Sequence, residues 1–260
     1  GGVSPIETLS LNALFAAEVE QRTPRDNFKN CLINSAHQFL NKQDGESYIL
    51  AGYPWFKCRA RDMFISLPGL TLSVGEIGKF EMIMETAIKA VYAFMEGKDS
   101  HLKVTEIEHP DVLLWMVWAI QQYAKMVSWD EARVKYGKLL KDVMEYLAGN
   151  KYPNLTVHDN GLVYAREKAV TWMNSTVNGR PVVARTGYIV EFNALWYNAL
   201  CFVADLLAGD EGFAAYLHQF SEKAAPSFIH TFLNEYGYLL DYVDGDMMDW
   251  TSEHDFCCRI

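Results

Sequence analysis

The sequence is poor in basic residues, and this scarcity limits the partners that the protein can bind. Its 260 residues include 23 Lys and Arg against 33 Asp and Glu, which gives a formal net charge of -10. Sequence-independent binding to nucleic acid or anionic lipid depends on clustered Lys and Arg side chains. We therefore expect no nucleic acid and no membrane surface as a partner. A neutral polar ligand fits this composition better.

The chain also lacks long apolar runs and an N-terminal basic segment followed by an apolar one. A helix that crosses a bilayer needs about 20 apolar residues in succession, and a secretory signal has that basic-then-apolar pattern. The five cysteines form no CxxC pair and no even framework, which indicates reduced thiols. Together these absences predict a soluble, cytoplasmic protein.

Metal-ligand patterns are missing as well. The seven histidines are scattered along the chain, whereas a zinc site needs closely spaced His or Cys residues with further ligands. The sequence therefore predicts no metal site and no cofactor.

Apolar and aromatic residues, in contrast, are abundant. Half of the residues are hydrophobic and 13% are aromatic, which suits a thick core or a sugar-binding cleft, because aromatic rings offer flat apolar faces to a ligand. No stretch resembles a linker. We expect one domain over residues 26–260, preceded by an entry segment over residues 1–25 that holds a short apolar helix.

Apolar residues recur at helical spacing along most of the chain. One expected helix is capped by Asp26, and a second begins at Arg61. Five further helices are expected at residues 80–95, 110–127, 130–147, 191–208 and 213–236. Residues 149–190 lack this period, are rich in Pro, Asn and Gly, and predict a long ordered excursion with a hairpin around residues 159–161. The fold class is therefore all-α. The pattern alone does not choose between a helical bundle and a toroid of helix pairs.

Residues 53–70 combine aromatic and charged side chains just before an apolar run. Trp55 offers a flat face to a ligand, and Asp62 follows Arg61 in the first turn of the expected helix, where a carboxylate suits the helix dipole. Such a stretch is also compatible with a capped helix and a surface ion pair. Residue types alone leave both interpretations open.

The order of the residues resembles a known family. The stretch Trp55-Phe56-Lys57-Cys58-Arg59-Ala60-Arg61-Asp62-Met63-Phe64-Ile65 is similar to a segment of glycogen debranching enzymes, in the domain with amylo-α-1,6-glucosidase activity. Further similar motifs lie at residues 30–39, 159–162, 171–173, 193–200 and 237–246. The resemblance extends from about residue 30 to residue 250, and several motifs in one order are more specific than any single one.

This resemblance implies an α/α toroid of the six-hairpin glycosidase type, with the site at one end of the ring. The sequence has only seven or eight long helices, so we expect the toroid to be incomplete. The implied partner is glycogen or a branched malto-oligosaccharide, and the implied reaction is hydrolysis of α-1,6 branch points.

The resemblance also implies which residues form the site. The family's general acid is an Asp at the position of Asn174, where an amide keeps the shape of a carboxyl group but has no proton to transfer near neutral pH. The implied substrate-binding residues are Trp55, Arg61, Asp62, Asp111, Trp115, Trp172, Arg185, Glu191, Asn193 and Trp196. For Trp115 and Trp196 core packing is an equal alternative, and Glu191 and Asp111 are also compatible with a role at a helix start.

Other differences from the family's motifs weaken the inference that this chain has the family's activity. Arg59 and Ala60 replace the family's Trp-Gly, and Ala184 replaces a Pro. The family's second carboxylate lies C-terminal to the matched motifs, and we expect this chain not to contain it. Glycosidic hydrolysis needs two carboxyl groups. The hypotheses are therefore a debranching-type glucosidase domain, either active or inactive, a catalytically silent carbohydrate-binding or scaffold domain, and an unrelated helical interaction domain.

Overall fold

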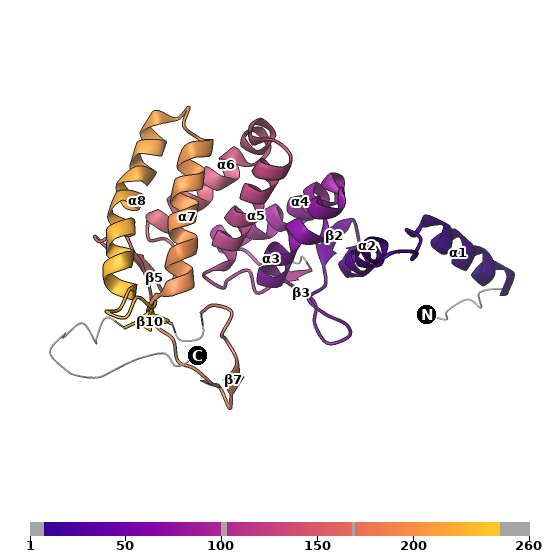
Figure 1. The fold of residues 1–260 in the computed structure, drawn as a ribbon, viewed down its shortest axis with the longest axis horizontal. Helices are drawn as coiled ribbons and strands as arrows, with labels where there is room; N and C mark the ends of the chain where they lie inside the picture. The colour runs from indigo at the N-terminus through magenta and orange to yellow at the C-terminus, as the bar shows by residue number, and fades with distance from the viewer. Residues whose placement is uncertain (1–7, 100–102, 168–169, 245–260) are drawn as a thin grey trace.

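The computed structural model describes residues 8–99, 103–167 and 170–244. Helices dominate this part of the chain, as expected (Figure 1). They are α1 (Thr8–Gln21), α2 (Phe28–Phe39), α3 (Ala60–Leu70), α4 (Ile77–Met95), α5 (Val112–Met126), α6 (Trp129–Ala148), α7 (Val190–Leu206) and α8 (Glu211–Phe232), with a short 3-10 turn η1 at Leu72–Val74. None of the helices described is long and apolar enough to cross a membrane.

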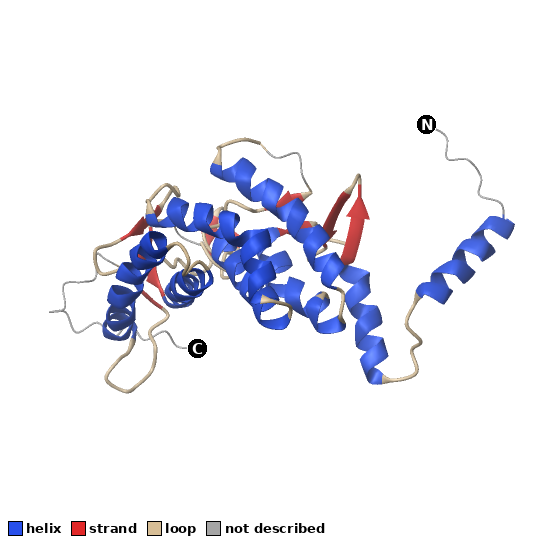
Figure 2. Ribbon diagram, turned by 90° about the horizontal axis from the view of Figure 1, so that it is seen from above, coloured by secondary structure: helices blue, strands red, loops and turns tan. Residues whose placement is uncertain are grey.

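The described helices from α3 onward form consecutive pairs. The first helices of the pairs, α3, α5 and α7, pack side by side, while α6 packs against α5 and α7, and α8 packs against α7. α4 begins the outer series and joins α5 and α6 through its Phe80 ring, which lies 5.1 Å from the Tyr123 ring. α1 stands apart from these pairs in both views (Figures 1 and 2).

Hydrogen bonds show that the first helices begin at the same end of the array. Arg61, in the first turn of α3, bonds to Asp111, the N-cap of α5. Tyr152, just after α6, donates to the Glu108 carbonyl just before α5, so the chain leaves α6 at that same end. Reciprocal 3.1 Å bonds between Gln121 and Asn198 then align the middles of α5 and α7.

The excursion over residues 149–190 contains short strands that periodicity does not reveal. The strands of the structure are β1 (Leu40–Gln43), β2 (Glu46–Ile49), β3 (Cys58–Arg59), β4 (Val104–Thr105), β5 (Leu155–Val157), β6 (Val163–Ala165), β7 (Thr176–Val177), β8 (Arg180–Pro181), β9 (Gly187–Ile189) and β10 (Tyr242–Val243). Strands β5 and β6 form the expected hairpin. They belong to a four-stranded sheet of order β10-β9-β6-β5, which leads directly into α7.

Gly187 allows strand β10 to pair with β9. Its φ is +87°, and a Cβ atom there would lie 2.4 Å from the Val243 carbonyl oxygen. Any side chain would therefore push β10 away. Because β10 follows directly on Asp241, this pairing also fixes the position of the Asp241 backbone.

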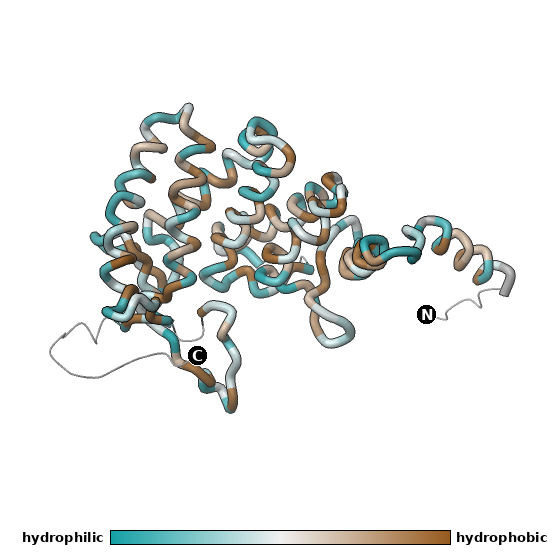
Figure 3. Tube along the Cα trace, viewed as in Figure 1, coloured by the Kyte–Doolittle hydropathy of each residue, from teal (hydrophilic) through white to brown (hydrophobic). Residues whose placement is uncertain are grey.

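One large hydrophobic core runs through the helix pairs. Helix α5 is buried along most of its length, including Val112, Met116 and Ile120, and the corresponding side of α7 buries Phe192 and Leu200. Polar residues recur along α8, at the edge of the array (Figure 3). A helix covered on several sides is apolar around most of its surface, whereas an edge helix is amphipathic.

The N-terminal caps of two helices differ from the sequence-based expectation. The N-cap of α2 is Asn27, whose side chain accepts the Asn30 amide at 2.9 Å, while Asp26 bonds to the Asn27 and Asn30 side chains instead. Helix α5 begins after Asp111, so Pro110 precedes the cap rather than occupying the first turn. Both Asp and Asn are good caps, so residue type alone did not fix the position.

Candidate functional site

A buried ion pair joins the starts of α3 and α5. Arg61 Nε and Nη2 donate to the two carboxylate oxygens of Asp111, each at 2.8 Å, and both side chains are almost fully buried. The indole Nε1 of Trp115 also donates to Asp111, at 3.2 Å. The geometry is a bidentate clamp between two helices. Asp62, in contrast, is exposed at the same helix end and takes no part in the hydrogen bonds of this clamp.

The loop before α3 carries exposed aromatic side chains at the same end. Trp55 is 82% exposed, and Phe56 lies beneath the guanidinium of Arg59, with 4.5 Å from Arg59 Cζ to the ring centroid. Arg59 Nε also lies 3.2 Å from Glu106 Oε1. The positive charge that replaces the family's Trp is thus already paired and stacked. This leaves Trp55 available as a flat surface facing solvent.

A second buried arginine, Arg185, links three separate segments near the start of α7. Nη1 donates to Thr171 Oγ1 at 3.0 Å and to Glu191 Oε1 at 2.8 Å, and Nη2 donates to Glu191 Oε2 at 2.6 Å and to Asp241 Oδ1 at 2.8 Å. The Thr171 hydroxyl donates to Glu191 at 2.7 Å. We call these four residues the Arg185 cluster.

The two carboxylates of the Arg185 cluster stabilise the positive charge of the Arg185 guanidinium. Burial disfavours the charged guanidinium, but the hydrogen bonds and charges of Glu191 and Asp241 outweigh this effect and raise the pKa of Arg185 above its ordinary value. Arg185 is only 1% exposed, whereas about a quarter of each carboxylate side chain remains exposed. The cluster therefore presents carboxylate oxygens, not the arginine, to the surface.

Trp172 and Asn174 lie on the loop that the Arg185 cluster anchors. Thr171 is buried, the next residue, Trp172, is 61% exposed, and Asn174 is half-buried. Beyond them, the hairpin β7–β8 extends outward below the helices (Figure 1). One anchored residue thus fixes the base of a loop that carries an open aromatic face and a polar amide.

Asn193 and Trp196 lie in the interior instead. The Asn193 amide bonds to Val163 and to the Ile189 carbonyl, and so joins α7 to β6. Trp196 is 1% exposed and donates to the Gly161 carbonyl at 3.0 Å. Of the two alternatives for Trp196, the structure therefore favours core packing, while Trp115 is half-buried beside the Arg61–Asp111 pair.

The sequence-based site set missed Thr171 and Asp241. Thr171 carries no charge and makes its contacts with residues 14 and 20 positions further along the chain. Asp241 contacts Arg185 across 56 positions. The sequence did contain a signal for both residues. Thr171 directly precedes Trp172 in the matched motif at residues 171–173, and Asp241 lies in the matched motif at residues 237–246.

Within the described ranges, no group of three or more His, Cys, Asp or Glu residues could hold a metal ion. Cys58 lies buried at the start of the Arg61 helix, and burial, with a smaller contribution from the Asp62 charge, raises the pKa of its thiol to about 12. A protonated, buried thiol is a poor nucleophile. Cys257 and Cys258 lie outside the described residues.

The described residues thus form a mostly helical domain with polar clusters at the starts of its helices. The family model for amylo-alpha-1,6-glucosidase matches residues 34–258, and the chain therefore belongs to that family. The match continues past residue 250, where the motif resemblance ends. No curated protein matches the chain.

Proposed function

We propose that this domain binds branched α-1,4/α-1,6 glucan, such as glycogen or a limit dextrin, at the end where α3, α5 and α7 begin, and that it does not release glucose. The family membership supports a glucan as ligand. The first helices of the pairs all begin at one end of the array. This arrangement supports the interpretation of the fold as part of an α/α toroid whose site lies at that end.

The observation that carries this proposal is the loop at residues 171–174. Thr171 is held by Arg185 and Glu191, while Trp172 stays exposed directly beside it. A solvent-facing indole next to an anchored residue is a suitable stacking surface for the apolar face of a pyranose ring. The exposed Trp55 at the start of α3 provides a further aromatic surface at the same end of the helix array.

Three neighbouring carboxyl or amide groups argue against turnover. Asn174 can accept and donate hydrogen bonds but cannot act as a general acid. Both oxygens of Glu191 bond to Arg185, and Asp241 shares the same guanidinium. A carboxylate whose oxygens already accept hydrogen bonds from a buried arginine is not free to position a water molecule or a leaving group. Among the described residues of the proposed site, the acid position is therefore an amide, and Glu191 and Asp241 are already engaged by Arg185.

Calorimetric titration with a branched limit dextrin tests this function. We expect saturable binding, and we expect Trp172→Ala to weaken it about tenfold, because a stacked ring is lost while the fold is unaffected. Phe28→Ala is the matched control, since Phe28 is an exposed aromatic residue on α2. Equal affinity in the wild type and in Trp172→Ala would contradict the assigned site, and absence of binding would favour an interaction domain.

A further inference from the structure

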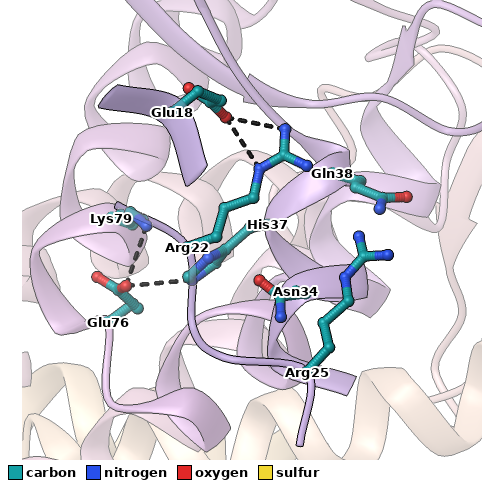
Figure 4. Close-up of a pocket in the computed structure, with 8 residues that line it drawn as sticks. All are labelled: Glu18, Arg22, Arg25, Asn34, His37, Gln38, Glu76 and Lys79. Carbon is teal, nitrogen blue, oxygen red and sulfur yellow. Dashed lines mark hydrogen bonds and ion pairs between the residues drawn. The ribbon is translucent and has the colours of Figure 1, made fainter. Parts of the chain in front are cut away.

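A polar pocket lies between α1, α2 and the start of α4. Its lining combines the side chains of three separate chain segments (Figure 4). They are Glu18, Arg22, Arg25, Asn34, His37, Gln38, Glu76 and Lys79. Arg61 is at the start of α3, whereas Glu76 and Lys79 follow the end of α3. The pocket is therefore at the opposite end of α3 from the proposed glucan site.

Acidic neighbours pair with two of the three cationic side chains here. Arg22 Nη2 lies 3.0 Å from Glu18 Oε1, and Lys79 Nζ lies 3.0 Å from Glu76 Oε1. Arg25 has no hydrogen bond or ion pair with any residue that the structure describes, and its guanidinium lies among the lining side chains (Figure 4). Three positive charges against two negative ones leave one excess positive charge, in a chain whose net charge is -10.

His37 adds an unsatisfied donor or acceptor at the same place. Its Nε2 atom is buried, and its 3.2 Å contact with Glu76 Oε1, drawn in Figure 4, is an ion-pair contact that lacks good hydrogen-bond geometry. Buried polar atoms in folded proteins are nearly always satisfied, so each exception needs an explanation, and a ligand supplies one.

The segment that carries Arg25 is also tied down. Asn34 Nδ2 donates to the Thr23 carbonyl at 2.6 Å, and this bond holds the connection between α1 and α2 against α2 two residues before Arg25. A guanidinium presents several N–H groups in a planar fork that matches phosphate oxygens. A second guanidinium, an ammonium and a histidine ring also line the pocket, and the first two already pair with Glu18 and Glu76.

We propose that this pocket binds a phosphoryl group, as inorganic phosphate or as a small phosphate monoester. Arg25 is the principal contact, the ion-paired Arg22 and Lys79 line the pocket beside it, and His37 Nε2 is a further polar atom within reach of a phosphate oxygen. Gln38, whose side chain is neutral, lies in the lining where the remainder of a monoester would be. The site is separate from the proposed glucan site.

Titration calorimetry at low ionic strength tests the proposal with inorganic phosphate, glycerol 3-phosphate and glycerol. We expect saturable binding of both phosphates, none of glycerol, and weaker binding as salt is added, because ion pairing is screened. Tighter binding of glycerol 3-phosphate than of phosphate would assign a monoester, and equal binding would assign the phosphoryl group alone.

Variants locate the binding. Arg25→Ala should weaken phosphate binding about tenfold or more, since a charge-assisted hydrogen-bonding group is lost, and Arg25→Lys should weaken it less. Arg133→Ala, an exposed arginine on α6, is the matched control and should leave affinity unchanged. Unchanged affinity in Arg25→Ala, equal binding of glycerol, or no saturable binding of either phosphate would overturn the proposal. Arg25 is exposed, so its replacement should leave the fold intact.

Discussion

The two buried arginines, Arg61 and Arg185, lie at the same end of the molecule but differ in the segments that they join. Arg61 has a single carboxylate partner, Asp111, and this pair joins two helices. Arg185 has two carboxylate partners and a hydroxyl, from three segments that include a loop and the residue before β10. The comparison indicates that the first arginine fixes the scaffold and the second fixes the loop that the scaffold presents.

Asp111→Ala should have the largest effect. It leaves the buried Arg61 charge without a counter-charge and also removes the acceptor for Trp115, and breaking a buried pair in this way costs about 3–5 kcal/mol. Urea denaturation measures the loss in the free energy of unfolding. Asp130→Ala, which breaks an exposed ion pair to Arg133, should cost less than about 1 kcal/mol. Similar losses in the two variants would refute the scaffold role.

Asp241→Asn should have an intermediate effect. Arg185 keeps Glu191 as a partner, and Asp241 is partly exposed, so we expect a loss of about 1–2 kcal/mol in the free energy of unfolding. The loop at residues 171–184 should become more sensitive to limited proteolysis, and dextrin affinity should fall with it. A loss as large as that of Asp111→Ala, with no local change in proteolysis, would make the two arginines equivalent.

Asn174→Asp should have the smallest effect. The new carboxyl group restores the acid position on a loop that already folds with a half-buried amide there, so stability should change by less than about 0.5 kcal/mol. Glucose release from branched dextrin should stay at background, because Glu191 and Asp241 remain paired with Arg185 and an acid without a free second carboxylate cannot complete hydrolysis. Turnover by the wild type would show that another group is the acid.

Helical periodicity predicted the helix pairs well because burial of one apolar face dominates their sequences. The helices at residues 112–126 and 129–148 fall within two residues of their expected bounds. Apart from the hairpin around residues 159–161, the strands of the excursion were not predicted, because segments of two or three residues are too short to show alternation. Their pairing depends on contacts such as Gly187 with Val243, which no local pattern encodes.

Prediction of the candidate site was limited in a similar way. Motif order identified Arg61, Asp111, Trp172 and Arg185, but it could not tell a buried clamp from an exposed binding group. Arg61 and Trp172 come from equally specific motifs, yet one is buried and the other mostly exposed. Burial of a polar side chain depends on partners that lie tens of residues away, as Asp241 does for Arg185.

The reciprocal amide pair between Gln121 and Asn198 makes the helix interface intolerant of changes in length. Each amide gives one hydrogen bond and receives one, so the pair works only when both side chains face each other. One inserted residue between Val190 and Asn198 would turn Asn198 by about 100° around the helix axis and leave both amides unmatched. Length variation should therefore accumulate in the β7–β8 hairpin, whose turn is exposed to solvent, so that the loop at residues 171–184 can diversify while the helix array keeps its register.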